Sequence, residues 1–325
     1  MINTPRRLLC QINMSNPISS HALFLLAPAG SGKTTLVFDF FQRNERNILM
    51  ILPLKCLERE VRSKVKAHSK EGFFFEAVTA EKAIHFIEGL EIDKRKDLLI
   101  VLDEVHLWNF WGDDFRPRLW ECFYYIAGNN FDILGLTATL RESYKQSWID
   151  LFESGGYFFD FLDFGNGELV NLPELEESYF GLKKSQMKRR ISYEVDAKRT
   201  CLIFCQYREE VFELERFLLS QSAELSLLTC VGGGGVQFSE ELENGPAPQV
   251  IISTSTLSHG VNLGKIERVF LTYEVLDWDI YLQMKARGGR GGEAFQVIGW
   301  QKDKSSLYTK IRLLLLDRYL SLFYA

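Results

Sequence analysis

The 325-residue sequence lacks the features that would place it in a membrane or in an oxidising compartment. No apolar run approaches the ~18 residues that a membrane-spanning helix requires. Residues 1–7 lack the apolar core of a secretory signal. The six cysteines form no CxxC pair and no zinc-like spacing with histidine. We therefore expect a cytoplasmic protein with no membrane partner, in which Cys201 and Cys205 are buried thiols.

An excess of positive charge is also absent. The formal net charge is −5 at pH 7, so no overall basic field attracts nucleic acid. Any binding of nucleic acid must therefore be confined to a local groove.

Short apolar runs instead alternate with helical patterns in both halves of the chain. Repeated strand–helix units predict a parallel sheet in each half, so the expected fold class is α/β. The length supports about two domains, on a prior of about 150 residues for each. Residues 141–196 show no clear sheet pattern. We therefore predict domains at 1–145 and 172–325, joined by a linker at 146–171.

The stretch APAGSGKTT at residues 27–35 organises the first half. It follows an apolar run at 22–26 that predicts a strand, and it precedes a segment at 36–41 that predicts a helix. A strand–loop–helix turn aims backbone N–H groups and the positive end of the helix at one point, which suits a triphosphate. The strict phosphate-loop pattern has Gly where this chain has Ala27, so a chance Gly-Ser turn is the alternative.

Each residue type in this loop has a chemical reason to be there. Glycines let the backbone approach the phosphates, Lys33 reaches the β- and γ-phosphates, and Thr34 offers its hydroxyl to Mg²⁺. The predicted cofactors are therefore ATP and Mg²⁺. The residues predicted to bind the nucleotide here are Gly30, Ser31, Gly32, Lys33, Thr34 and Thr35.

A second motif, LLIVLDEVH at 98–106, is an apolar strand that ends in two carboxylates. Ligands of parallel sheets bind at the carboxyl ends of the strands, so these acids are expected at that edge. Asp103 can hold Mg²⁺ through water, and Glu104 can orient and deprotonate an attacking water. The alternative is a strand end followed by solvated acids.

In order along the chain, these and further segments resemble the motifs of superfamily 2 helicases of the DExH type, with features of the superkiller-like branch. Residues 27–34 resemble motif I, in which Ala at the first position is common, and 103–106 resemble motif II as a DEVH box. Residues 53–60, 79–82, 137–139, 202–204 and 254–263 resemble motifs Ia, Ib, III, IV and V. Residues 283–290 are similar to motif VI, usually Q-x-x-G-R-x-G-R, with Ala286 in place of the first Gly and both arginines kept.

The resemblance implies two tandem RecA-like domains that close on ATP, and it assigns further roles. Arg290, with Arg287 beside it, would stabilise charge on the γ-phosphoryl group, and Gln283 would position that group or the attacking water. The other implied nucleotide-binding residues are Gln11, Gly260 and Asn262. The implied coupling residues are His106, Thr137 and Thr139. The implied contacts to a single strand of DNA or RNA are Pro53, Leu54, Thr79, Arg208 and Thr254.

The resemblance also has limits. Superkiller-like helicases usually carry a winged helix and a ratchet domain, whereas 35 residues follow Arg290 in this sequence, with a predicted strand at 295–299 and a predicted apolar helix at 307–324. The helix either packs on the second domain or docks a protein partner. We therefore expect stimulated ATPase activity with poor separation of long duplexes. The alternatives are a motor subunit that works only in a larger complex, and another phosphate-loop enzyme such as a kinase.

Overall fold

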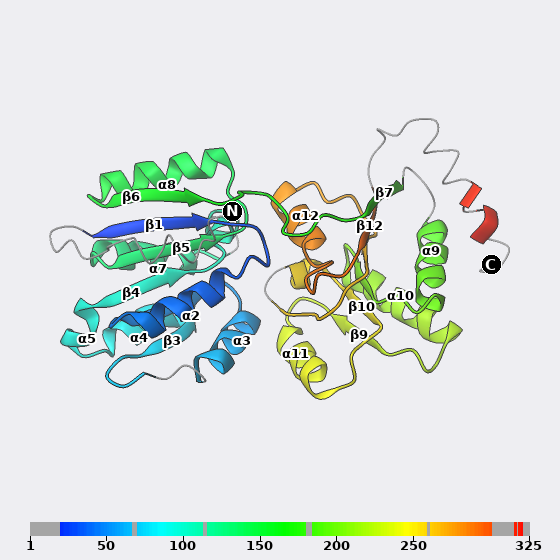
Figure 1. Cartoon of the computed structure of the whole chain (residues 1–325), viewed down its shortest axis with the longest axis horizontal. Helices are drawn as coiled ribbons and strands as arrows, with labels where there is room; N and C mark the ends of the chain where they lie inside the picture. Colours follow the sequence, from blue (N-terminus) through cyan, green and yellow to red (C-terminus); the bar gives the residue numbers. More distant parts are fainter. Residues whose placement is uncertain are drawn as a thin grey trace. The chain divides into compact units, whose positions relative to one another are not determined.

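Uninterrupted apolar runs form the central strands of two parallel sheets. The computed structural model describes residues 20–66, 70–112, 116–179, 184–258, 261–300, 315–316 and 318–320. The chain divides into two units, of which the first ends at Val170 and the second begins at Asn171 (Figure 1). Within the described ranges, no helix combines the length and apolar character needed to cross a bilayer.

The first unit contains a six-stranded parallel sheet in the order β3-β2-β4-β5-β1-β6. Its strands are β1 (His21–Leu26), β2 (Asn47–Leu52), β3 (Phe75–Thr79), β4 (Leu98–Leu102), β5 (Asp132–Thr137) and β6 (Phe158–Asp163). Its helices are α2 (Lys33–Arg43), α3 (Lys55–Lys66), α4 (Ala80–Glu88), α5 (Ile92–Lys96), α6 (Val105–Gly112), α7 (Arg118–Gly128) and α8 (Glu142–Ser154).

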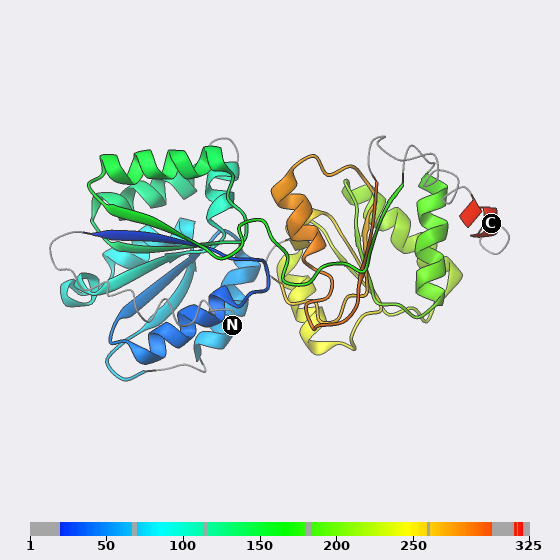
Figure 2. The same ribbon diagram turned by 45° about the horizontal axis from the view of Figure 1, so that its top comes forward.

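Alternate residues of each strand pack on opposite faces of this sheet. Phe24 and Leu26 of β1 belong to the core covered by α4, α6, α7 and α8. Leu23 and Leu25 of the same strand belong to the core covered by α2 and α3. Figure 2 shows α8 (green) and α2 (blue) on opposite sides of the sheet. Burial on both faces explains why the central strands are apolar along their whole length.

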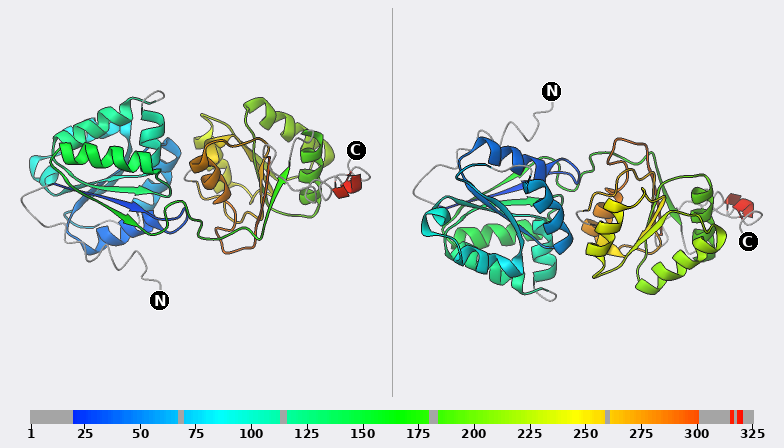
Figure 3. Two further views of the ribbon diagram at one scale, coloured as in Figure 1. Left: turned by 90° about the horizontal axis from the view of Figure 1, so that it is seen from above. Right: turned by 90° about the horizontal axis from the view of Figure 1, so that it is seen from below.

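The second unit repeats this plan with a sheet in the order β7-β12-β11-β8-β10-β9. Its strands are β7 (Leu175–Tyr179), β8 (Cys201–Phe204), β9 (Leu227–Cys230), β10 (Val250–Ser253), β11 (Arg268–Leu271) and β12 (Gln296–Trp300). Its helices are α9 (Lys184–Asp196), α10 (Arg208–Gln221), α11 (Gly235–Asn244) and α12 (Trp278–Lys285), with a 3-10 turn η1 (Ser255–Ser258). Apolar residues of α9 and α10 share a core with one face of the sheet, and Figure 3 shows α11 and α12 on the other face.

The α/β class and the parallel sheet in each half are therefore confirmed. Cys201 and Cys205 are buried free thiols, as expected. Burial, followed by the negative charge of Glu194, raises the pKa of the Cys201 thiol, which stays protonated at neutral pH. The predicted strand at 295–299 corresponds to β12, and most of the predicted helix at 307–324 lies outside the described residues.

The structure of residues 141–196 differs from the prediction made from the sequence. Instead of a linker, residues 146–163 form most of α8 and all of β6 and are part of the first unit, and β7 and α9 follow in the second. Both strands lie at the edges of their sheets, where β6 pairs with β1 and β7 pairs with β12. Edge strands carry polar side chains such as Asp160 and Glu176 rather than a continuous apolar run, so their pattern is weak.

The contact between β5 and β1 provides a test of this packing. Gly135 of β5 is paired with Phe24 of β1, and a Cβ added to Gly135 would lie 2.4 Å from Phe24 Cδ1. We expect Gly135→Ala to lower the free energy of unfolding by about 1–3 kcal/mol, because a closely packed core cannot take an extra methyl group. Urea unfolding measures this change.

Gly128→Ala is the matched control. A Cβ added to Gly128, the last residue of α7, meets nothing within 4 Å, so this variant should keep or slightly raise the stability. Equal stabilities for Gly135→Ala and the parent would contradict the packing described here.

Candidate functional site

Three neighbouring strands of the first sheet lead into the three motifs that the sequence analysis identified there. β1 pairs with β5 in a register that sets Leu26 beside Thr137, and β5 pairs with β4 on its other side. Because the strands are parallel, their carboxyl ends meet at one edge. That edge therefore brings together the loop at 27–35, the acids at 103–104 and the segment at 137–139.

The loop at 27–35 has the backbone of an anion-binding turn. Gly30 and Gly32 have φ values of +82° and +88°, and a Cβ at either would meet nothing within 4 Å. The backbone conformation, rather than lack of space, therefore requires glycine at these positions. Gly32 precedes α2 and provides no side-chain cap, so the first N–H groups of that helix face the loop.

Lys33 is the first residue of α2, and its ammonium group lies against the loop. Nζ donates hydrogen bonds to the carbonyl oxygens of Ala27 (2.7 Å) and Pro28 (3.1 Å). The lysine is thus already directed into the turn, where the predicted phosphates would lie.

A segment after β6 supports the same loop. Ala29 forms a parallel bridge with Leu169. Gly165 has a φ of +118°, and a Cβ there would lie 3.2 Å from Pro28 Cγ. The bridge therefore supports the residue before Gly30, and the chain at Gly165 passes close to Pro28.

Asn166, in the same segment, holds the chain that follows β5. Its side chain accepts a hydrogen bond from the Leu140 N–H (2.7 Å) and donates one to the Leu140 carbonyl (2.9 Å). The adjacent Gly167 N–H donates to the carbonyl of Ala138 (3.0 Å). Sequence alone did not reveal this role of Asn166, because its partner Leu140 is 26 residues away.

The acid pair sits where β4 turns into α6. The Asp103 N–H donates to the Ile51 carbonyl (3.0 Å), and its carbonyl accepts from Trp108 Nε1 (3.2 Å). Glu104 has a φ of +48°, a conformation that L-residues rarely adopt and that often marks functional sites. Its Oε2 is buried, has no hydrogen-bond partner among the described residues, and lies 3.5 Å from His106 Nδ1.

A buried polar chain connects the acid pair to β5. The Thr137 hydroxyl donates its one proton to the carbonyl of Thr139 (2.7 Å). At its 2.9 Å contact with His106 Nδ1 the hydroxyl must therefore accept, so this nitrogen carries the proton. His106, Thr137 and Thr139 are all at most 3% exposed. The structure thus brings the three predicted coupling residues into one cluster.

These residues fit a nucleotide with Mg²⁺. The lysine and the uncapped start of α2 supply donors for phosphate oxygens, and the Thr34 hydroxyl and the Asp103 carboxylate supply the oxygen ligands that Mg²⁺ prefers. The described part of the chain contains no cluster of three or more acidic, histidine or cysteine side chains suited to a metal. A Mg²⁺ ion held here would therefore need phosphate and water oxygens as well.

The predicted nucleic-acid contacts of the first unit also lie at this edge. Pro53 and Leu54 directly follow β2, and Thr79 is the last residue of β3. β2 and β3 pair in a register that sets Leu52 beside Thr79. The starts of α3 and α4 therefore lie side by side.

The second unit gathers its predicted residues at the carboxyl ends of its own strands. Thr254 follows β10, and its hydroxyl lies 2.9 Å from that of Thr256. Arg208 begins α10 and donates to the Gly232 carbonyl. Asn262 is exposed, and its Oδ1 accepts from the Gly264 N–H (3.2 Å). Gln11 and Gly260 lie outside the described residues.

The two arginines of the motif at 283–290 have different environments. The side chain of Arg287 is buried, and its Nε and Nη1 donate to the carbonyls of Ser258 (3.2 Å) and Val261 (2.6 Å). Arg290 is half-buried, and its Nε donates to the Ala286 carbonyl (2.9 Å). Arg287 therefore ties the end of η1 to Val261, and Arg290 is the less buried of the two arginines.

Gln283, on α12 in the same motif, is a buried polar side chain. It is 2% exposed, and its Nε2 has no hydrogen-bond partner among the described residues. An amide that is buried without a partner in the protein is suited to meet a polar ligand.

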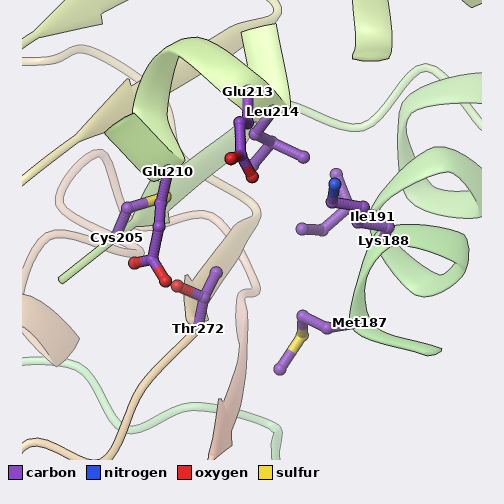
Figure 4. Close-up of a pocket in the computed structure, with 8 residues that line it drawn as sticks. All are labelled: Met187, Lys188, Ile191, Cys205, Glu210, Glu213, Leu214 and Thr272. Atoms are coloured by element: carbon purple, nitrogen blue, oxygen red, sulfur yellow. The ribbon is translucent and has the colours of Figure 1, made fainter. Parts of the chain in front are cut away.

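A hollow of about 480 Å³, open to solvent, lies between α9, α10 and the ends of β8 and β11 (Figure 4). Met187, Ile191 and Leu214 form its apolar walls. Glu210 and Glu213 line it with a single lysine, and the Glu210 carboxylate caps the start of α10. Two carboxylates against one ammonium group do not suit a triphosphate, so we assign no nucleotide to this hollow.

Comparison with known proteins bears on the fold. Residues 183–292 match the family described as "Helicase conserved C-terminal domain". The chain is similar to S. cerevisiae Dbp5 bound to RNA and ADP BeF3, with a TM-score of 0.65 and 15% identity over 92% of this chain and 83% of that one. It is also similar to the DEAD-box helicase Mss116 bound to ssRNA and UDP-BeF, with a TM-score of 0.72 and 14% identity over 96% and 77%.

A third similar structure is the DUF1998 helicase MrfA bound to DNA, with a TM-score of 0.61 and 16% identity over 94% of this chain and 47% of that one. At these identities the likeness establishes the fold. The two units are tandem RecA-like domains, as the sequence analysis expected, and the second unit carries the helicase C-terminal match.

The contrast between the two arginines can be tested by stability. Arg287→Ala should lower the free energy of unfolding by about 2–4 kcal/mol, because it removes two charge-assisted hydrogen bonds and leaves a cavity. Arg290→Ala should change it by less than about 0.5 kcal/mol, as for most substitutions outside a core. Urea unfolding of both variants measures the difference, and equal stabilities would contradict the assignment of Arg287 to a structural contact.

Proposed function

We propose that the chain is an ATP-dependent nucleic-acid helicase or translocase, in which ATP hydrolysis drives movement along a strand of DNA or RNA. One observation carries the proposal: three adjacent parallel strands lead into a phosphate-loop lysine, an acid pair and a histidine–threonine cluster at one sheet edge. The helicase C-terminal match at 183–292 and the helicase fold support the same assignment of a nucleic-acid-dependent ATPase.

In the proposed reaction, the first unit binds the nucleotide. Lys33 and the N–H groups at the start of α2 hold the phosphates, and Thr34 with Asp103 would hold Mg²⁺, which neutralises phosphate charge when bound. Glu104 orients the attacking water and takes its proton. Its Oε2, which is buried and has no hydrogen-bond partner among the described residues, is the atom proposed to accept that proton.

The second unit is proposed to complete the reaction. Charge develops on the γ-phosphoryl oxygens in the transition state, and a guanidinium group stabilises it. Arg290 is the proposed group, with Gln283 donating from Nε2 to the γ-phosphate or the water. Because these residues belong to one unit and Lys33 to the other, hydrolysis requires the two units to close on ATP, and its products let them part.

Strand binding is proposed at the starts of the helices that follow β2, β3, β8 and β10. The contacts would come from Pro53, Leu54, Thr79, Arg208 and Thr254. Backbone amides and hydroxyls at such positions hold phosphates without reading bases. Of the similar structures, Mss116 is bound to ssRNA and MrfA to DNA, so either nucleic acid fits the proposal.

The DEVH sequence at 103–106 further supports placement in the DExH type, superkiller-like branch.

A second candidate is a motor subunit that acts only within a larger complex. Leu315 and Tyr319, in the short described part of the C-terminal segment, are 64% and 56% exposed. This candidate places a protein partner at that segment.

The ATPase rate with single- and double-stranded DNA and RNA, added in turn, tests the proposed function. We expect stimulation by at least one single-stranded nucleic acid. No stimulation by any of the four would overturn the proposal.

Two substitutions in the first unit should separate binding from chemistry. Lys33→Ala should weaken ATP binding, because it removes the main cation on the phosphates, whereas Glu104→Gln should keep ATP binding and stop turnover. Nucleotide titration and steady-state hydrolysis measure the two effects. Normal turnover in Glu104→Gln would contradict the assignment of Glu104 as the general base.

Arg290→Ala should leave nucleotide affinity within a small factor and lower the rate of hydrolysis by about 10³ or more, the scale on which arginine fingers act. Single-turnover hydrolysis with saturating nucleic acid measures this rate. If the variant hydrolyses ATP like the parent, Arg290 does not stabilise the transition state.

A further inference from the structure

Arg116 lies outside every helicase-like motif, yet its guanidinium joins two of them. Nη1 donates to the carbonyl of Pro53, which directly follows β2, and Nη2 donates to Oε1 of Glu81 in the first turn of α4. The Arg116 side chain is 19% exposed. One planar group therefore contacts the loop before α3 and the start of α4 at the same time.

The two joined segments are neighbours by strand pairing. Leu52 of β2 is in register with Thr79 of β3, so the chain leaves both strands at the same level of the sheet. A second tie joins the two helices themselves, where Lys82 Nζ of α4 donates to Glu58 Oε1 of α3 (3.0 Å). Arg116 is thus the tie nearest the sheet edge, and it lies beside the residues proposed to contact the nucleic acid.

The charge of Arg116 is largely compensated within the protein. Burial alone would raise the pKa of the Glu81 carboxyl, but the hydrogen bond and charge of Arg116, with further hydrogen bonds, outweigh burial and lower it. Glu81 is therefore ionised at neutral pH and pairs with the guanidinium. The guanidinium is therefore paired with a carboxylate of the protein, and it also donates to the Pro53 carbonyl.

We propose that Arg116 is a positioning residue for nucleic acid: it fixes the spacing between the loop at Pro53 and the start of α4, so that both bind consecutive phosphates of one strand. This inference rests on the proposed function. In this proposal Arg116 acts through Pro53 and Glu81, and it does not itself contact the nucleic acid.

The test measures binding of a labelled single-stranded oligonucleotide by the full chain with an ATP analogue, at several salt concentrations. Arg116→Ala should raise Kd about tenfold, the scale of a lost charge-assisted hydrogen bond. The slope of log Kd against log salt should match that of the parent, because no phosphate contact is lost. The KM for ATP and kcat at saturating nucleic acid should stay at parental values.

Arg118→Ala is the matched control, since Arg118 is two residues away, exposed, and paired with Glu121 of its own helix. It should bind like the parent. Glu81→Gln keeps the shape of the partner but removes its charge, and it should raise Kd in the same direction as Arg116→Ala. If Arg116→Ala does not fold, nucleic-acid binding by Glu81→Gln is measured in its place. Amide hydrogen exchange at residues 54–57 and 80–83 should be faster in both variants.

The outcomes are distinct. Parental affinity in Arg116→Ala, or in Glu81→Gln where it is the measured variant, would overturn the inference and leave the proposed function standing. A slope lower by about 0.7, the contribution of one phosphate on a single strand, would show a direct contact and also overturn it. A parent chain that binds no single strand would overturn the proposed function itself.

Discussion

The parallel register of β4, β5 and β1 is the constraint on which the rest of the candidate site depends. The strands themselves carry no catalytic group, but each delivers its next residues to one edge. A slip of one residue would turn every apolar side chain to the opposite face of the sheet. Because separate cores lie on the two faces, with Phe24 in one and Leu25 in the other, such a slip is strongly disfavoured. Hydrophobic packing thus fixes the spacing between the lysine and the acid pair.

That packing also sustains a backbone conformation that the sequence at 104 does not favour. A non-glycine residue at positive φ costs about 1–3 kcal/mol, and it persists only where its surroundings hold it. Asp103 provides this support, since its N–H and its carbonyl are both bonded, to β2 and to Trp108 of α6. Glu104 is thereby held between a fixed strand end and a fixed helix start, with its carboxylate beside His106.

The features that sequence could predict are those whose signal is local. The loop glycines, the acids after an apolar strand and the strand–helix alternation each depend on neighbours along the chain, and the structure places them as expected. The hydrogen bonds made by the side chains of Arg116, Asn166 and Arg287 depend instead on partners between 26 and 63 residues away. The edge strands β6 and β7 were missed because they contain polar residues and so lack a continuous apolar run. Tertiary contact, rather than local pattern, determines these features.

The distribution of these contacts bears on how a chain with a net charge of −5 could bind a polyanion. Lys33, Arg116 and Arg287 all donate to backbone carbonyls in this structure, and Arg116 also pairs with Glu81. These cations shape loops rather than form an exposed basic surface. On the proposed function, recognition of the strand phosphates then depends mainly on backbone N–H groups at helix starts such as that of α4, which has no side-chain cap. Such groups act only at short range and in fixed directions, so the spacing of the helix starts becomes the property that must be maintained, and buried or paired arginines maintain it.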